Sequence, residues 1–532
     1  MISLKIDNKE IEVPAGTTVL EAATLSGISI PSMCFLKGHS NHPACMVCLV
    51  KDNRNGALVP SCALVATNGM DLNASDPDVL EARRKSLELL MSDHVGDCEA
   101  PCSLACPANM EIPLMNRLIG EGRFTDALNV VKDDIALPYI LGYICPAPCE
   151  KACRRKQIDE PVSICVLKRF SASAGSDNKA LAASRKLNLI SPEPAGKIAI
   201  IGSGPAGLAA AYYLQIYGHS CTLFDKASEP GGTLRSDIPD EELPKNIIDL
   251  EVEIIRSMGA AFRFNTLVTE EFYNSDIKDS FDAVIIASGD TAAGTHFANL
   301  IASTKTGYQT DEKNMSSSLP GIFVCGSAIR PHKMAVRSVA QGKTAASSVH
   351  AFLHQKHFEK PAKIFNSRFD KLLPAEYSEY LKESIPDRRV MAVSGYTGGF
   401  SEAEAILEAQ RCLHCDCRKK DDCKLRNNSD EYKIERKRFQ VGNRKAMTKK
   451  VQHDLVVFEP EKCIKCGLCV EISSGESEKY GLAFEGRGFD VVVNSPLGVS
   501  FSEGLNKTAI ECVTSCPTGA LSFKNSNNNN ER

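Results

Sequence analysis

"GKIAIIGSGPAGLAAAYYLQIYGHSCTLFDK", residues 196–226, carries the strongest fold signal in this chain. An apolar strand leads into a G-x-G-x-x-G turn, an Ala-rich helix follows, and a second strand ends at Asp225. Glycines at this spacing allow a tight turn and bring a pyrophosphate close to the helix N-terminus, while an acid at the position of Asp225 suits a ribose hydroxyl. The stretch predicts a Rossmann-like α/β unit. Its predicted phosphate-binding residues are Gly202, Gly204, Pro205, Ala206 and Gly207.

Three stretches that follow this turn resemble the flavin-contacting segments of the glutamate synthase small subunit. They are "EPGGTLRSDIPDEELPKNIIDLEVEII", "DAVIIASGD" and "GIFVCGSAIRPHKMAVRSVAQGKTAASSV". The resemblance implies FAD in preference to NAD in this unit. It also departs from the family pattern, because Gly326-Ser327 stands where the family has Gly-Asp beside the ribityl chain. The residues that the resemblance assigns to the cofactor are Gly231, Gly232, Leu234, Arg235, Gly289, Gly326 and Ser327.

The same family carries an inserted NADPH-binding domain that this sequence lacks. Only residues 290–319 lie between "ASGD" and "PGIFVCGSA", and they contain no second glycine fingerprint. A βαβ unit needs about 30 residues and a domain at least about 50. We therefore expect a flavin unit without its own hydride donor.

Residues 98–172 resemble the N-terminal helical domain of the glutamate synthase small subunit, which dihydropyrimidine dehydrogenase shares. The matching segments are "CEAPCSLACPANMEIPLMNRLIGEGRFTDALNVV" and "LPYILGYICPAPCEKACRRKQIDEPVSICVLKRF". The resemblance implies two 4Fe-4S clusters with interleaved ligands. The first set it implies is Cys106, Cys145, Cys149 and Cys153. The second set would be Cys98 and Cys102 with two departures from the family pattern, His94 and Cys165, and loss of this second cluster is the alternative.

The first 62 residues contain cysteines in the order of a 2Fe-2S ferredoxin site. The spacing is C-x10-C-x2-C-x13-C, made by Cys34, Cys45, Cys48 and Cys62. This spacing, with its long first gap, resembles the N-terminal domain of the large iron–sulfur subunit of respiratory complex I and of some iron hydrogenases. The flank "LELLMSDHVGDC" resembles the His-x3-Cys pattern of that subunit, which implies His94 as a cluster ligand. Structural zinc at the four cysteines is the alternative.

Two further cysteine sets lie near the C-terminus. "RCLHCDCRKKDDC" contains four cysteines that suit a 4Fe-4S cluster, with zinc as the alternative. "EKCIKCGLC" and a later Cys-Pro follow the bacterial ferredoxin pattern for one more 4Fe-4S cluster, since Ser473 and Cys512 do not complete a second motif. The two predicted sets are Cys412, Cys415, Cys417 and Cys423, and Cys463, Cys466, Cys469 and Cys516.

The composition agrees with an iron–sulfur protein of a reducing compartment. The chain has 532 residues, 22 cysteines and a net charge of −4. The first residues read as a strand and not as a signal peptide, and no apolar run is long enough to span a bilayer. We expect a cytoplasmic protein that does not bind nucleic acid and does not span a membrane. Residues 418–450 carry 13 Lys or Arg against 5 Asp or Glu, which indicates either a solvated face or a docking patch for an acidic partner such as a ferredoxin.

The expected fold class is multidomain α/β and α+β. The predicted parts are a β-grasp 2Fe-2S ferredoxin domain (1–78), a helical two-cluster domain (79–190), a Rossmann-like FAD domain without an NADPH insert (191–355), a linker and helix (356–411), a ferredoxin-like 4Fe-4S region (412–523) and a disordered tail (524–532). Of the two remaining cysteines, Cys221 is expected in the core, and Cys325 could be a redox thiol beside the flavin.

These features favour an oxidoreductase that works as an electron-transfer subunit. One FAD, one 2Fe-2S and about four 4Fe-4S clusters would relay electrons to and from partner subunits of diaphorase, hydrogenase or dehydrogenase type, or a ferredoxin. An NAD(P)H-dependent oxidoreductase of the glutamate synthase small-subunit type is the alternative. A scaffold with degenerate cofactor sites is a third interpretation. The sequence leaves catalytic residues, terminal donor and acceptor open.

Overall fold

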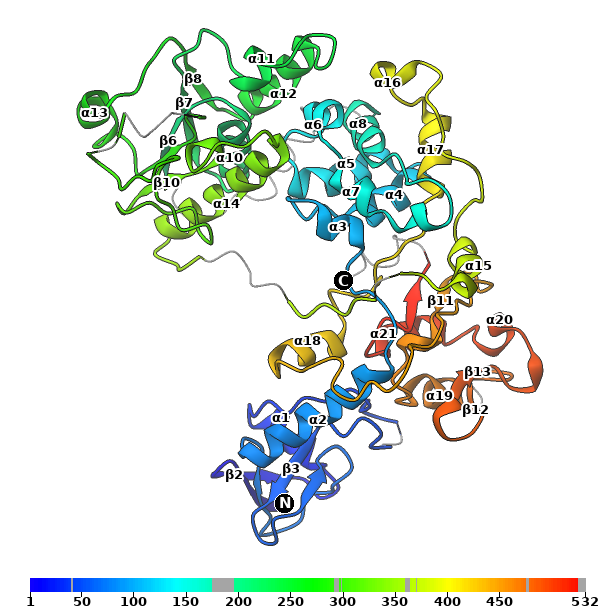
Figure 1. Cartoon of the computed structure of the whole chain (residues 1–532). Helices are drawn as coiled ribbons and strands as arrows, with labels where there is room; N and C mark the ends of the chain where they lie inside the picture. Colours follow the sequence, from blue (N-terminus) through cyan, green and yellow to red (C-terminus); the bar gives the residue numbers. More distant parts are fainter. Residues whose placement is uncertain are drawn as a thin grey trace. The chain divides into compact units, whose positions relative to one another are not determined.

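The computed structural model describes residues 1–39, 42–174, 196–290, 296–297, 299–358, 364–369, 371–474 and 478–524. The chain divides into two compact units (Figure 1). The first unit contains Met1–Ala100, Lys363–Glu383 and His414–Arg532, and the second contains Pro101–Ala362 and Ser384–Leu413. The disordered tail expected over 524–532 lies outside the described residues, apart from Lys524.

The N-terminal part of the first unit is a five-stranded sheet of β-grasp type with one helix. Apolar residues alternate along the first hairpin and point into the core, as the sequence predicts. The sheet order is β2-β1-β5-β3-β4, with β1 and β5 parallel. Its elements are β1 (Ile2–Ile6), β2 (Lys9–Val13), α1 (Val19–Leu25), β3 (Leu49–Asp52), β4 (Leu58–Pro60) and β5 (Asp71–Asn73). A capping box between Thr18 and Glu21 starts α1.

The rest of the first unit consists of one long helix and several short helices and strands joined by loops (Figure 1). A long helix, α2 (Pro77–Asp93), begins at the N-cap Asp76 and ends at His94. The C-terminal part pairs β11 (Val456–Phe458) with β14 (Leu521–Phe523) and β12 (Ala483–Glu485) with β13 (Val492–Asn494), both antiparallel. The other helices are α15 (Tyr377–Leu381), α18 (Lys424–Glu431), α19 (Leu468–Ser473), α20 (Phe501–Gly504) and α21 (Ala509–Ser515).

The second unit starts with a helical part. Its helices are α3 (Pro101–Ala105), α4 (Ile112–Gly120), α5 (Phe124–Asp134), α6 (Pro138–Ile144), α7 (Pro148–Ala152) and α8 (Ile164–Ala174). Two later helices, α16 (Gly395–Gly398) and α17 (Glu402–Gln410), belong to the same unit, and α17 packs against α4 and α8. Ser401 is the N-cap of α17 and forms a capping box with Glu404.

The remainder of the second unit is the predicted Rossmann-like layer. Five parallel strands have the order β10-β9-β6-β7-β8, and most of their residues are buried, as parallel sheets require. The strands are β6 (Lys197–Ile201), β7 (Ser220–Phe224), β8 (Ala261–Arg263), β9 (Ala283–Ile286) and β10 (Ile322–Val324). The helices are α10 (Pro205–Ile216), α11 (Thr233–Ser236), α12 (Lys245–Ser257), α13 (Glu270–Phe272) and α14 (Ala335–Leu353), and α10 packs along α14.

The described part of the connection from β9 to β10 is irregular. Its described residues, 287–290, 296–297 and 299–321, form turns and isolated bridges, with neither a helix nor a strand.

Candidate redox cofactor sites

The glycine-rich turn after β6 has the shape that a bound pyrophosphate requires. Gly202 has φ +106°, and a Cβ there would lie 2.4 Å from the Ala287 carbonyl oxygen. A Cβ at Gly207 would lie 2.0 Å from the Gly202 carbonyl oxygen, whereas the space beside Gly204 is open. Gly204 is also the N-cap of α10, so the backbone N–H groups of the first helical turn face that open space.

The predicted flavin segments meet at this turn. The Gly231 N–H donates to the Ser203 carbonyl at 2.9 Å, and a Cβ at Gly232 would lie 3.1 Å from the Gly204 Cα. Asp225, at the end of β7, accepts from the Ser203 N–H at 2.7 Å and from its hydroxyl at 2.6 Å. These contacts gather the carboxyl ends of neighbouring strands, where dinucleotides bind in open α/β sheets.

The other predicted flavin residues have mixed surroundings. Gly326, with φ +72°, donates its N–H to Gln341 Oε1 at 2.9 Å and leaves no room for a Cβ beside Ala206. Gly289 has φ +81° and open space beside it. The Ser327 hydroxyl donates to the His332 carbonyl at 3.4 Å. Leu234 is buried. The Arg235 guanidinium contacts the Pro230 carbonyl, Glu229 and Asp249.

Neither of the two cysteines of this sheet has the surroundings of a reactive thiol. Cys221 lies in β7 and is buried, as expected for a core residue. Cys325 is also buried, and burial raises its pKa to about 12. A thiol that resists ionisation is a poor nucleophile, so the structure does not favour the redox-thiol interpretation of Cys325.

The four N-terminal cysteines converge in one buried site. Cys34 Sγ and Cys45 Sγ are 3.4 Å apart, and Cys62 hydrogen-bonds both Cys34 and Cys48. These hydrogen bonds lower the pKa of Cys34. Ser61 ties the loops together, since its N–H and hydroxyl both donate to the Cys48 carbonyl, at 3.1 and 2.7 Å. Four gathered thiols fit a 2Fe-2S cluster.

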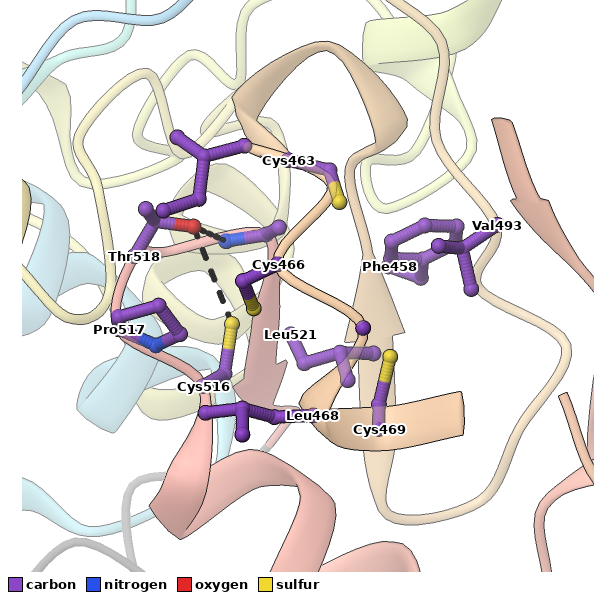
Figure 2. Close-up of a pocket in the computed structure, with 13 residues that line it drawn as sticks. Phe458, Cys463, Cys466, Leu468, Cys469, Val493, Cys516, Pro517, Thr518 and Leu521 are labelled. Atoms are coloured by element: carbon purple, nitrogen blue, oxygen red, sulfur yellow. Dashed lines mark hydrogen bonds between the residues drawn. The ribbon is translucent and has the colours of Figure 1, made fainter. Parts of the chain in front are cut away.

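The ferredoxin-pattern cysteines line a hollow in the C-terminal part of the first unit. Figure 2 shows the side chains of Cys463, Cys466, Cys469 and Cys516 directed toward a common space beside Phe458 and Leu521. About 350 Å³ of this hollow is unfilled by protein atoms, part of it open to solvent. Burial raises the pKa of Cys463 to about 11. Cys512 and Ser473, which the sequence pattern leaves out of the ligand sets, have other roles. Cys512 lies in the core, and the Ser473 hydroxyl accepts from the Leu482 N–H at 2.8 Å.

A third thiol group in the first unit joins segments far apart in the sequence. The Cys417 N–H donates to the Cys98 carbonyl at 3.1 Å, and the thiols of Cys98, Cys417 and Cys423 interact electrostatically. Burial is the main cause that raises the pKa of Cys98 to about 11. The sequence pattern predicts Cys98 with Cys102, and Cys417 and Cys423 with Cys412, so the structure groups these thiols differently, and the ligand sets stay a prediction.

His94 belongs to the surroundings of this third group. It is the C-cap of α2, four residues before Cys98. Burial, followed by the charges of Lys462 and Arg436, lowers its pKa to about 3. Its Nδ1 is buried without a hydrogen-bond partner. A buried, neutral imidazole with an orphaned nitrogen has the chemistry of a metal ligand.

The thiol group of the second unit also differs from the predicted one. Cys165 hydrogen-bonds Cys145 and Cys149, and Cys106 interacts electrostatically with Cys145. The sequence pattern predicts Cys153, and not Cys165, in the set with Cys145 and Cys149. Cys165 lies beside Cys145 because α8 packs closely on α6. Gly142 allows this close approach, since a Cβ there would lie 2.4 Å from Arg169 Cβ.

Cys153 instead lies on the side of Arg411. It is the C-cap of α7, and its thiol interacts with the Arg411 charge. The Arg155 guanidinium donates to the Arg411 carbonyl at 2.9 Å, which holds the segment carrying Cys412 beside the end of α7. Cys102, on α3, is buried and α3 packs against α7. Cys102, Cys153 and Cys412 thus belong to one unit, whereas Cys415 belongs to the other.

Two buried lysines lie beside the thiols, and the sequence motifs do not predict a role for either of them. Lys168 lies three residues after Cys165 on α8, a spacing that puts both on one helix face and could have been noticed. Lys462 packs against Gly96 and near Cys417, which no local pattern indicates.

The basic segment 418–450 is largely paired within the first unit. Arg418 and Lys449 contact Glu383 at 2.6 and 3.1 Å, and Arg438 contacts Glu88 at 3.0 Å. These ion pairs explain much of the local charge as internal structure and weaken the case for a docking patch.

Three segments match known domain families. Residues 1–77 match the 2Fe-2S iron-sulfur cluster binding domain, residues 91–180 match dihydropyrimidine dehydrogenase domain II, 4Fe-4S cluster, and residues 200–270 match the NAD(P)-binding Rossmann-like domain. The chain therefore combines ferredoxin-type iron–sulfur domains with a Rossmann-like dinucleotide domain. In the described part of the chain, every helix is too short or too polar to cross a membrane.

The relatives are oxidoreductases or subunits of oxidoreductases. NADPH-Fe(3+) oxidoreductase subunit beta of Geobacter sulfurreducens is 38% identical over 36% of this chain and 28% of its own length. NADP(+)-dependent formate dehydrogenase subunit beta of Moorella thermoacetica is 34% identical over 42% and 32%. The glutamate synthase [NADPH] small chain of Bacillus subtilis is 35% identical over 35% and 36%. The chain thus spans about a third of the length of these relatives.

Among solved structures, an NAD+-reducing [NiFe]-hydrogenase in the H2-reduced state aligns at 29% identity with a TM-score of 0.18. The alignment covers 23% of this chain and 49% of that chain.

Proposed function

We propose that this chain is an electron-transfer subunit of a multisubunit oxidoreductase, in which iron–sulfur clusters and FAD relay electrons between partner subunits. The observation that carries the proposal is the combination of several buried thiol groups with one dinucleotide unit whose β9–β10 connection, in its described residues, has no second nucleotide-binding fold. Clusters carry one electron each, and a flavin exchanges one or two.

The thiol groups support a specific ligand assignment. A 2Fe-2S cluster would be held by Cys34, Cys45, Cys48 and Cys62. Three 4Fe-4S clusters would be held by Cys463, Cys466, Cys469 and Cys516; by His94, Cys98, Cys417 and Cys423; and by Cys106, Cys145, Cys149 and Cys165. A fourth 4Fe-4S cluster would use Cys102, Cys153 and Cys412, and the ligand role of Cys415 stays a prediction.

The first unit contains a relay built around the C-terminal ferredoxin site. Cys466 interacts electrostatically with Cys34 and packs against the core of the 2Fe-2S domain, while Leu36 of that domain packs against the ferredoxin core. On its other side, Cys516 interacts with Cys423. We infer that electrons cross the first unit from the 2Fe-2S site to the His94-containing site through the ferredoxin site, or in reverse.

The glycine turn supports FAD as the dinucleotide. Its residues would hold the pyrophosphate at the N-terminus of α10, and Asp225 would orient the ribose. Without an attached hydride donor, the isoalloxazine would exchange electrons with clusters or with a partner subunit. The partners fit diaphorase, hydrogenase or dehydrogenase subunits or a ferredoxin, and reduced thiols fit a cytoplasmic location.

The test measures cofactors first and reactivity second. Anaerobically purified protein should contain one FAD and about 18 irons per chain, the sum for one 2Fe-2S and four 4Fe-4S clusters. Fewer than about 12 irons would contradict the cluster assignment. NADH or NADPH added to the chain alone should leave the flavin absorbance unchanged, and rapid bleaching would instead support the NAD(P)H oxidoreductase alternative. Chains that co-purify with this one would identify its partners.

A further inference from the structure

Lys168 is a buried lysine that has no carboxylate partner among the described residues. Its side chain is 3% exposed, and among the described residues no carboxylate lies within ion-pair distance of it. The buried lysines Lys132 and Lys462, by contrast, contact Glu251 at 3.2 Å and Glu459 at 2.5 Å. An ammonium group away from water is costly unless an anion compensates it.

The anions that surround Lys168 are thiols. Its Nζ lies 4.0 Å from Cys165 Sγ, and Cys145, Cys149 and Cys106 act on the same ammonium group. Burial opposes its charge, but the four thiols together raise its pKa above the usual range. These four are the cysteines assigned above to one 4Fe-4S cluster, and a cluster with four thiolate ligands is anionic in both oxidation states.

Reduction adds one more negative charge to such a cluster. A positive charge fixed nearby, in a site shielded from solvent, stabilises the reduced state more than the oxidised state. Net charge and burial are among the factors that set cluster potentials. At the ferredoxin site, the lysine that acts on a ligand thiol is Lys465, beside Cys463, and this lysine is partly exposed and pairs with Asp93 at 3.5 Å.

We propose that Lys168 raises the reduction potential of the cluster held by Cys106, Cys145, Cys149 and Cys165, and so makes this cluster an electron-accepting member of the relay. The inference rests on the proposed function, because it requires that cluster. Lys168 acts through the electrostatic field on the ligand sulfurs and has no part in proton transfer.

The experiment is a potentiometric titration followed by EPR on the full-length holoprotein. In K168M and K168Q the ratio of reduced to oxidised cluster at a given potential should fall at least tenfold, which is a shift of about 59 mV to lower potential. K168R keeps the charge and should stay within about threefold of the unchanged protein. The double variant K132M/E251Q removes a buried ion pair elsewhere in the same unit and should not shift the signal.

A second readout uses cluster-free protein, in which the charge of Lys168 has no cluster to compensate. There K168M should unfold at a higher temperature than the unchanged chain, the opposite of a merely structural lysine. If neutral variants lose iron while K168R retains it, the requirement for charge is supported. Loss of iron in all three, or an unchanged potential in K168M and K168Q with the cluster present, would overturn the inference.

Failure of the proposed function has a different signature. In that case the unchanged protein itself lacks the iron and the EPR signal of this cluster, and the inference about Lys168 falls with it.

Discussion

Replacing Gly142 with alanine should remove one 4Fe-4S cluster without touching the others. Gly142 lies in α6 where α8 crosses it, and an added Cβ would lie 2.4 Å from Arg169 Cβ and 2.9 Å from Arg169 Cα. Carbon atoms normally approach to about 3.5–4.0 Å, so α8 must move away by roughly 1 Å. That movement separates Cys165 on α8 from Cys145 at the end of α6.

The energetic cost follows from two opposing terms. Overpacking of this kind costs about 1–3 kcal/mol, and the contact with backbone places Gly142→Ala near the upper end. Alanine in place of glycine within a helix stabilises the folded state by about 1 kcal/mol. We therefore expect a net loss of about 2 kcal/mol in stability, together with a loss of about four irons per chain.

The assay combines iron analysis, EPR and calorimetry on anaerobically purified protein. Gly120→Ala is the matched control, because a Cβ there would lie 3.3 Å from the flexible Gln410 side chain and 3.9 Å from the Gln410 backbone nitrogen, an ordinary contact. It should keep all its iron and unfold at an unchanged or slightly higher temperature. Full iron content and an unchanged unfolding temperature in Gly142→Ala would refute the assignment of Cys165 to the Cys145 group.

Three further predictions address other parts of the chain. His94→Ala should change the EPR spectrum and lower the iron content, whereas His94→Cys should retain both; unchanged iron and EPR in the alanine variant would remove His94 from the ligands. Gly207→Ala should purify without flavin absorbance, because its Cβ would lie 2.0 Å from the Gly202 carbonyl oxygen; a normal flavin content would show that this turn is not the binding site. Acid should destabilise the second unit through His219. Burial, and after it the nearby His350 and His354, lower the pKa of His219 to about 4. Between about pH 6.5 and pH 4 only the unfolded state binds this proton, so stability is full above about pH 6.5 and falls by up to about 3 kcal/mol toward pH 4. Unfolding temperatures of His219→Gln should lack this part of the pH dependence, and parallel curves for the two proteins would exclude it.

The local patterns of the sequence are sufficient for the parts whose chemistry is local. The G-x-G-x-x-G turn requires glycine because of contacts within one strand–turn–helix unit, so its spacing alone predicted the Rossmann layer. The ferredoxin loop is also local: Cys463, Cys466 and Cys469 come from a single turn. The short connection between β9 and β10 could likewise be read from residue counts, because no compact domain fits into so few residues.

The grouping of distant cysteines depends on the tertiary structure. The even spacing of Cys98, Cys102 and Cys106 suggests a common helical face, yet Cys98 lies with Cys417 in the first unit, while Cys102 and Cys106 belong to the second. Cys165 replaces Cys153 beside Cys145 because α8 packs closely on α6 at Gly142. Spacing along the chain reports which residues share a helix or a loop, whereas a cluster collects ligands across helix–helix contacts. Those contacts depend on side-chain packing between segments far apart in the sequence, and so does the burial that brings Lys168 among the thiols.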